Sequence, residues 1–285
     1  MKLRVTHRTR YDYASPVTDS HNEVHLHPTP LCGQTLHSFV LKILPATQLK
    51  HYSDFYLNIV HFFDIPQPHS TLIVESNSVV TTCQNRLPED LKTAPLSHLQ
   101  ACTRMEECHD FLGTSSYITL SAEVWKLARE ACQGIDDVWQ SALAIMRFVY
   151  ESFTYAPATT TVYTPMSQVL VGRYGVCQDF AHVMIGMCRT LKIPARYVSG
   201  YLYNGPTETL TGAQASHAWV EVYVPGWGWR GLDPTNNCQA DEHHVKVAVG
   251  RDYADVVPIR GHYFGTPEMK MTVHVEVERL EDEEL

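Results

Sequence analysis

The stretch RYGVCQDFAH, from Arg173 to His182, opens the segment that decides the fold. From Cys177 onward, apolar residues recur at positions i, i+3, i+4 and i+7, which is typical of an amphipathic helix with one buried face. The residues on this face are Cys177, Phe180, Ala181, Met184, Ile185, Cys188 and Leu191. We expect the helix to begin at or next to Cys177 and to end before Pro194.

Cys177 would stand in the first turn of this helix, where backbone N–H groups lack an acceptor and create a partial positive charge. Such a position favours the thiolate, the nucleophilic form of cysteine, and the same N–H groups can stabilise an oxyanion. Gly175 lets the backbone turn sharply just before it. The alternative is that Cys177 packs as a small apolar side chain, as we expect for Cys188.

A catalytic cysteine needs a base, and His182 is a poor candidate because five helical residues turn it about 140° away from Cys177. His217 is better placed, since QASHAWVEVYV predicts a strand that would hold the ring rigidly. Asp233 ends the next predicted strand, where its carboxylate can accept the second ring N–H. PGWG can join the two strands as a hairpin and bring imidazole and carboxylate together. Each residue alone is more often structural.

The rest of the chain predicts an α+β protein. Up to about Cys83 the apolar residues alternate, as in SFVLKIL and TLIVES, which predicts strands. Two amphipathic helices follow, SAEVWKLAREACQG with Ser121 as N-cap and Gly134 as stop, and DDVWQSALAIMRFVYESF ending near Phe153. We therefore expect a β-rich, sandwich-like domain over residues 1–105 and, over residues 106–285, helices packed on an antiparallel sheet.

Composition narrows the function classes. The net charge of −9 and the acidic end ERLEDEEL disfavour nucleic acid and anionic membranes as partners. The first residues lack the apolar core of a signal peptide and no stretch approaches the roughly 20 apolar residues of a membrane span, so we expect a cytoplasmic location.

Metal and disulfide signals are weak. The eight cysteines, at irregular spacings, are expected to be reduced thiols. Cys102, Cys108 and His109 lack a second ligand pair at zinc spacing, and no calcium-loop motif is present. We therefore expect neither a metal nor another cofactor.

Three motifs, GVCQDFAH, SHAWVEVYVPGWGW and GLDPTNN, resemble in order those of the transglutaminase-like superfamily, whose members share a papain-like cysteine protease core. YDYASPV, VHLHPTP, YLNIVHFF and GRDYADVVPIRGHYFG are similar to bacterial members that carry their own N-terminal β domain. The resemblance implies that Cys177 attacks an amide or acyl carbonyl, that His217 acts as general base and acid, and that Asp233 orients the ring. It implies a peptide or protein amide substrate and leaves open whether water or an amine accepts the acyl group.

Further side chains are candidates for the same site. Tyr155 or Gln168 could supply a second oxyanion donor beside the cysteine's own N–H. Trp219 would share a strand face with His217 and could shield the imidazole from water, and Asn237 could contact it. The simpler alternatives are core packing for Tyr155 and Trp219 and a turn for Asn237.

The segment HHVKVAVGRDYADV holds His244, Arg251 and Asp252, which the resemblance places on a substrate-facing loop. A solvated turn with a salt bridge is the commoner explanation of such a run. Two rival functions also remain. One is a non-catalytic peptide-binding module on the same fold, and the other is an amidase that releases a glycan from an asparagine side chain.

Overall fold

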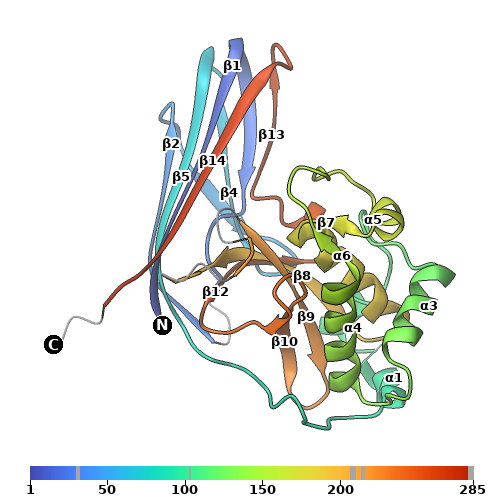
Figure 1. Ribbon diagram of the computed structural model, residues 1–285. Coiled ribbons are helices and arrows are strands. Elements are labelled where there is room, and N and C mark those ends of the chain that lie inside the picture. Colours follow the sequence, from blue (N-terminus) through green and yellow to red (C-terminus); the bar gives the residue numbers. More distant parts are fainter. Residues whose placement is uncertain (30–32, 103, 206–209, 213–215, 282–285) are drawn as a thin grey trace.

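The computed structural model describes residues 1–29, 33–102, 104–205, 210–212 and 216–281. A tall β-rich part stands beside a compact part in which helices cover a second sheet (Figure 1). The N-terminal strands are β1 (Lys2–Val24), β2 (Gln34–Leu44), β3 (Lys50–Ser53), β4 (Ile59–Ile65) and β5 (His69–Thr82). The sequence predicted a β-rich region over these residues, and this is confirmed.

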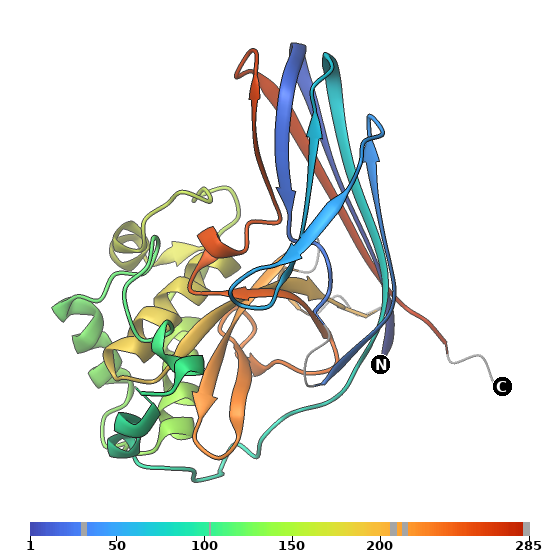
Figure 2. The same cartoon turned by 180° about the vertical axis from the view of Figure 1, so that it is seen from behind.

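The long strand β1 folds the first sheet over on itself. Its first half pairs with β5 and with β14 (Met269–Arg279), and its second half pairs with β4 and with β13 (Ile259–Phe264). Figure 2 shows β1, in blue, rising, bending at the top and returning in the opposite layer. The two layers enclose an apolar core that includes Val17, Phe63 and Val74. The result is the expected sandwich-like arrangement.

The end of the chain returns to this first sheet. Strands β13 and β14 lie within the region 106–285 that the sequence analysis grouped with the helices, yet both pair with β1. Alternating patterns predict a strand but not its partner, because strand pairing is a contact between residues far apart in the sequence. The sandwich is therefore built from both ends of the chain.

The helical layer follows the predicted pattern. Ser121 caps α3 (Ala122–Ala131) by accepting the Val124 N–H, and α4 (Val138–Ser152) ends at the residue before Phe153. Helix α6 (Cys177–Thr190) begins at Cys177 as predicted and is buried along almost its whole length. The remaining helices are α1 (Leu99–Cys102), α2 (Glu106–His109) and α5 (Met166–Gly172), and short 3-10 turns are η1 (Leu96–His98) and η2 (Tyr253–Asp255). In the described part of the chain, no helix combines the length and apolar character needed to cross a membrane.

The second sheet has the strand order β11-β10-β9-β8-β12. Its strands are β8 (Ala195–Leu202), β9 (His217–Val224), β10 (Gly228–Asp233), β11 (Cys238–Gln239) and β12 (His244–Gly250). Strands β9 and β10 form the predicted hairpin, with Val220 opposite Leu232. A short parallel pair, β6 (Thr154–Tyr155) and β7 (Tyr174–Gly175), leads into α6. The predicted α+β class, with helices on an antiparallel sheet, is confirmed.

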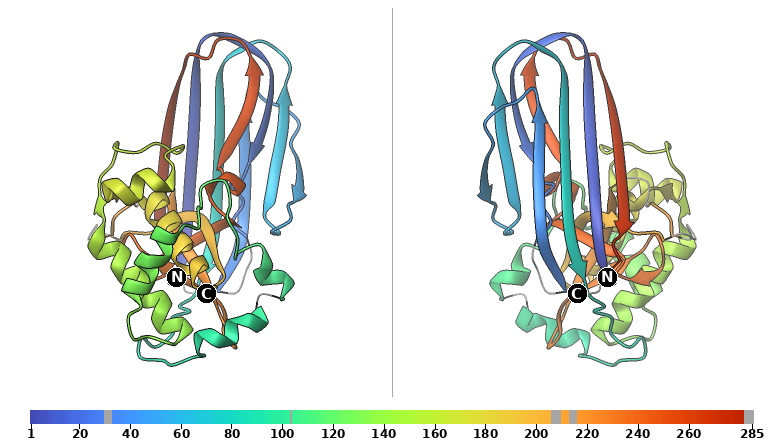
Figure 3. Two further views of the ribbon diagram at one scale, coloured as in Figure 1. Left: turned by 90° about the vertical axis from the view of Figure 1, so that its right-hand side faces the viewer. Right: turned by 90° about the vertical axis from the view of Figure 1, so that its left-hand side faces the viewer.

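Two amides join the sandwich to the second sheet. The Gln34 side chain donates to the Lys246 carbonyl (2.8 Å) and accepts the Lys246 N–H (2.9 Å). Asn58 makes the same pair of bonds with Val249, both 2.8 Å. Each amide thus replaces a neighbouring strand on the outer edge of β12 and satisfies backbone groups that would otherwise be buried without partners. Figure 3 shows the sandwich standing directly against the helical part.

Candidate active site

Cys177 is the first residue of α6, and the turn before it is tied down by Asp179. The Asp179 carboxylate accepts the Val176 N–H (2.8 Å) and the Thr160 hydroxyl (2.7 Å). A Cβ on Gly175 would lie 2.6 Å from this carboxylate, so only glycine fits there. We predicted Gly175 for a sharp backbone turn; its φ lies outside the left-handed region, and the actual reason is space.

His217 and Asp233 are brought together by the β9–β10 hairpin. His217 opens β9, Asp233 ends β10, and His217 Nε2 lies 2.8 Å from Asp233 Oδ2. Both side chains are fully buried. The other carboxylate oxygen accepts the backbone N–H groups of Thr235 (2.9 Å) and Asn236 (3.3 Å). The carboxylate is therefore held in a fixed orientation toward the ring.

The surroundings of His217 strongly favour its charged form. Burial alone would lower the pKa of His217, but the charge of Asp233, its hydrogen bond and the nearby Cys177 thiol outweigh burial and raise this pKa to about 10. In the same way burial would raise the pKa of Asp233, yet His217 and His244 hold it well below its usual range. The pair is stable as imidazolium and carboxylate.

The second ring nitrogen of His217, Nδ1, differs from the first in its surroundings. Nδ1 is buried and has no hydrogen-bond partner among the described residues. A Cβ on Gly212, whose φ is +92°, would lie 2.7 Å from this nitrogen. Glycine at 212 therefore keeps Nδ1 free, a requirement that the sequence analysis missed because the segment around it carried no recognisable pattern.

The asparagine that supports the pair is Asn236, where we had considered Asn237. Asn236 Nδ2 donates to Asp233 Oδ2 (2.7 Å) and to the Thr211 carbonyl (3.2 Å), while its Oδ1 accepts the Thr211 N–H (2.8 Å). Asn237 has a positive φ of 50°, and its buried Oδ1 has no partner among the described residues. Asn237 is thus the turn residue. The run of two asparagines after Asp-Pro-Thr was the available signal, but it could not show which one points inward.

His244 joins the site from β12. Its Nε2 lies 3.4 Å from Asp233 Oδ2 and its Nδ1 lies 3.2 Å from Asp241 Oδ1. Burial would lower the pKa of His244, but hydrogen bonds to the two carboxylates raise it. The Trp219 ring packs against both histidines, at 5.2 Å from His244 and 6.2 Å from His217 between ring centroids. We expected His244 on a substrate-facing loop; it instead lies behind the carboxylate.

Arg251 and Asp252 lie away from this group. Arg251 makes a two-pronged ion pair with Asp255, at 2.9 Å for both contacts. Asp252 is buried and accepts the N–H groups of Tyr117 (2.7 Å) and Ala254 (2.9 Å). Neither lines the cavity that contains Cys177. The commoner explanation, a turn with a salt bridge, fits Arg251. Asp252 is instead buried and caps the short turn η2, so neither residue lies on a substrate-facing loop.

A cavity of about 720 Å³ opens over Cys177. Its lining comes from the start of α6, the end of β8, the segment before β9 and strand β14 of the sandwich. The lining residues are Tyr155, Pro157, Val176, Cys177, Leu202, Tyr203, Asn204, Gly205, Leu210, Thr211, Gly212, Ser216, Val275 and Val277, with no acidic or basic side chain among them. Of the two predicted oxyanion donors, Tyr155 lines this cavity, whereas Gln168 is exposed on α5 and is not part of the lining.

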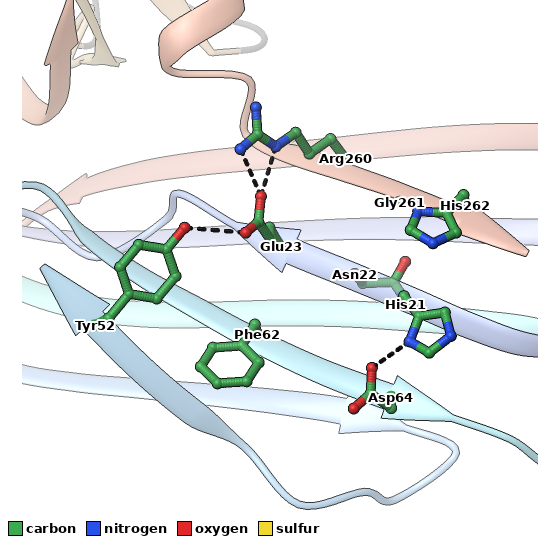
Figure 4. A pocket seen from close by; sticks show the side chains of 9 residues that line it. All are labelled: His21, Asn22, Glu23, Tyr52, Phe62, Asp64, Arg260, Gly261 and His262. Atoms are coloured by element: carbon green, nitrogen blue, oxygen red, sulfur yellow. Dashed lines mark hydrogen bonds and ion pairs between the residues drawn. The ribbon is translucent and has the colours of Figure 1, made fainter. Parts of the chain in front are cut away.

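A second hollow, of about 550 Å³, lies on the outer face of β1, β3, β4 and β13 (Figure 4). Glu23 accepts hydrogen bonds from Arg260 (2.7 Å) and Tyr52 (3.0 Å), and His21 Nδ1 lies 2.6 Å from Asp64. These charged groups thus pair with one another, and the described lining contains no cysteine, serine, threonine or lysine. Cys177 remains the better candidate for chemistry.

Two groups of described side chains bring three metal-ligand atoms within 4.8 Å of one another. They are His217, Asp233 and His244, and Asp241, Glu242 and His243. In the first group the ligand atoms already hydrogen-bond to each other, so a cation would have to displace those bonds. The second group is a partly exposed turn. Cys102, Cys108 and His109 do not form such a group.

Comparison with known proteins agrees with the resemblance that the three motifs around Cys177, His217 and Asp233 indicated. Residues 126–234 match the transglutaminase-like superfamily, and residues 3–81 match the bacterial transglutaminase-like N-terminal region. A protein of Mycobacterium leprae with no characterised activity is 34% identical over 281 residues, covering 98% of this chain and 99% of its own length. A protein-glutamine gamma-glutamyltransferase of Pseudomonas aeruginosa is 34% identical over 100 residues, which are 33% of this chain and 15% of that enzyme.

Among solved structures, a candidate cysteine protease from Cytophaga hutchinsonii aligns with all of this chain and 92% of its own, with a TM-score of 0.79 and 26% identity. This alignment includes the sandwich as well as the helical part. The chain belongs to the transglutaminase-like superfamily and carries the N-terminal region of its bacterial members.

Proposed function

We propose that this protein is a cysteine enzyme that acts on amide or peptide bonds through a thioester formed on Cys177. The observation that carries the proposal is the fully buried His217–Asp233 pair, with a 2.8 Å hydrogen bond, whose free ring nitrogen lies near the cysteine at the start of α6. The similarity to a candidate cysteine protease and to a glutamyltransferase supports the same bond type. Neither relative fixes the substrate.

The first half of the reaction forms the thioester. The Cys177 thiolate attacks the amide carbonyl carbon, and the electron pair of the C=O bond moves to oxygen. When this tetrahedral intermediate collapses, the C–N bond breaks and protonated His217 gives its proton to the leaving nitrogen. Asp233 keeps the imidazole in the tautomer and orientation that this transfer requires.

The second half releases the acyl group. Water or a primary amine enters in place of the departed amine, His217 removes its proton, and the new nucleophile attacks the thioester carbonyl. The C–S bond then breaks and the thiolate is restored. Water as acceptor gives a carboxylic acid, and an amine gives a new amide.

Two donors are available for the oxyanion. The Cys177 N–H is in the first turn of α6 and has no acceptor within the helix. The Tyr155 hydroxyl lines the same cavity. Burial, with the nearby charges of Cys177 and Asp233, raises the pKa of Tyr155 to about 12, so this hydroxyl stays protonated at neutral pH and can donate. We propose the pair as the oxyanion site.

The test is a comparison of wild type with Cys177→Ala on a pool of synthetic peptides, with and without a primary amine. We expect wild type alone to produce mass changes in the peptides, and the added amine to appear in the products if transfer occurs. A covalent acyl adduct on Cys177, captured by acid quenching and mass spectrometry, would identify the intermediate. Identical product spectra from the two proteins would overturn the proposal.

A further inference from the structure

Strand β14 carries a continuous apolar stripe on one face. Its alternate residues, in order along the strand, are Met269, Met271, Val273, Val275 and Val277. Pairing with β1 places Val277 opposite Val5 and Val273 opposite Thr9. Those β1 side chains are buried, so the stripe belongs to the inner face of its layer. The residues between, such as Thr272, point to the outer face.

The stripe is uncovered at one end and enters the active-site cavity at the other. Met269, Met271 and Val273 are 48%, 55% and 41% exposed, although they lie on an inner sheet face. Val275 and Val277 are half-buried and line the cavity over Cys177. The five residues span about 27 Å at ~3.4 Å per residue. Exposed apolar surface of this length, continuous with the cavity of an enzyme, indicates a site for part of its substrate.

β14 also has an open edge. It pairs with β1 on one side, and among the described residues no strand pairs with its other side. Figure 3 shows β14, in red, at the edge of its layer on the side of the helical part. The N–H and C=O groups of such an edge can pair with an added extended chain, whose alternate side chains then lie on the stripe.

We propose that β14 is the substrate-docking strand of this enzyme. An extended peptide segment pairs with its open edge, lays alternate apolar side chains beside Met271 and Val273, and reaches Cys177 with its scissile amide. Because the described lining of the cavity holds no aspartate, glutamate, lysine, arginine or histidine to pair with a charged side chain, the segment next to that amide is uncharged. This inference rests on the proposed function and names its substrate class, a polypeptide in extended conformation with alternating apolar residues.

The probes are ten-residue peptides that carry a bromoacetyl group, which the thiolate converts to a thioether by displacing bromide. One peptide has valine at alternate positions and its match has aspartate there. Each is made with the group at its N-terminus and, separately, on a C-terminal lysine, so that both directions along β14 are sampled. The rate of labelling at Cys177 is measured by mass spectrometry, and iodoacetamide, which does not reach β14, reports on the thiol alone.

We expect one direction of the valine peptide to label Cys177 at least tenfold faster than its aspartate match. Val273→Asp should remove this preference, and so should Met271→Asp, which replaces a more exposed residue if the first variant folds poorly. Thr272→Asp, on the outer face of the same strand, is the matched control and should keep the preference. The iodoacetamide rate should be unchanged in all three variants.

The two proposals fail in different ways. Equal labelling by the valine and aspartate peptides in wild type, or equal effects of Val273→Asp and Thr272→Asp, would overturn docking on β14 while leaving the enzyme intact. An iodoacetamide rate at Cys177 no greater than that at the exposed Cys83 would instead count against the proposed function.

Discussion

Two buried charged clusters lie on one face of β9, four residues apart, and they differ in one respect. Around Glu221 every charge is paired: its carboxylate contacts Arg196 (2.8 Å) and Lys246, and the Arg196 guanidinium stacks on Trp229 at 4.2 Å. Around His217 one ring nitrogen pairs with Asp233 and the other has no hydrogen-bond partner among the described residues.

Under the proposed function, this difference separates a structural cluster around Glu221 from a reactive one around His217. A buried cluster whose polar atoms all have partners holds strands together, and none of its atoms is free to take part in a reaction. A cluster with one unpartnered atom next to a nucleophile and a cavity can exchange a proton. Changes at Asp233 should therefore affect mainly the reaction, and changes at Glu221 mainly the stability.

The largest effect is expected from Asp233→Asn, which removes the charge and keeps the shape. Without the carboxylate the pKa of His217 should fall from about 10 and the ring should lose its fixed tautomer. We expect peptide turnover to drop about 10³- to 10⁴-fold. The measurement is the pH profile of turnover. A variant with the wild-type rate at neutral pH would make the His217–Asp233 pair a scaffold like that of Glu221.

Glu221→Gln should give the opposite result. Two nearly buried cations would lose their counter-charge, and we expect the free energy of unfolding to fall by about 3–5 kcal/mol, as is usual when one partner of a buried ion pair is removed. Urea denaturation measures this change, and the turnover of the folded fraction should stay near wild type. Glu23→Gln is the control, because its pair with Arg260 is partly exposed to solvent and should contribute at most about 1 kcal/mol.

Lowering the pH should reveal how much the ion pairs of Glu221 contribute to stability. Burial would raise the pKa of Glu221, but Lys246 and Arg196 lower it from 4.5 to about 2. A carboxyl group whose pKa is lowered by folding stabilises the protein above its unfolded value, and this contribution is lost as the pH falls from 4.5 toward 2. The stability gap between wild type and Glu221→Gln should therefore shrink by about 3 kcal/mol over that range. A gap that stays constant from pH 5 to pH 2.5 would contradict the assignment of the ion pairs.

The smallest effect on turnover is expected at His244, which lies behind the Asp233 carboxylate. His244→Gln removes a ring that touches Asp233 and Asp241, and we expect turnover to fall about tenfold, as for other residues that position a catalytic group. The pH profile should shift as well, because the charge of His244 acts on the same carboxylate. His243→Gln, whose ring contacts Asp241 but not Asp233, is the matched control. Equal effects of the two variants would assign His244 a purely structural role.

Local patterns predicted several features of the fold and of the candidate site. Helical periodicity placed Cys177 at the start of α6 and turned His182 away from it. His182 is indeed buried, with its ring stacked on Tyr117 and its pKa lowered to about 3, chiefly by burial. Strand alternation and the PGWG turn paired β9 with β10, which brings His217 to Asp233.

Other features were beyond the reach of such patterns. The choice of Asn236 over Asn237, and the position of His244 behind Asp233, depend on turns and on a strand contributed from elsewhere in the chain. The roles of Gly175 and Gly212 depend on the side chains that face them. None of these contacts has a periodicity that a sequence could display.

The sequence by itself determined the elements and the order of the cysteine, histidine and aspartate along them, because hydrophobic periodicity and capping act between residues close in the chain. Only the tertiary structure decided that the final strand of the chain joins the N-terminal sheet and forms part of the wall over Cys177. Strand pairing across more than 250 residues is chosen by the packing of whole layers, which no local segment encodes.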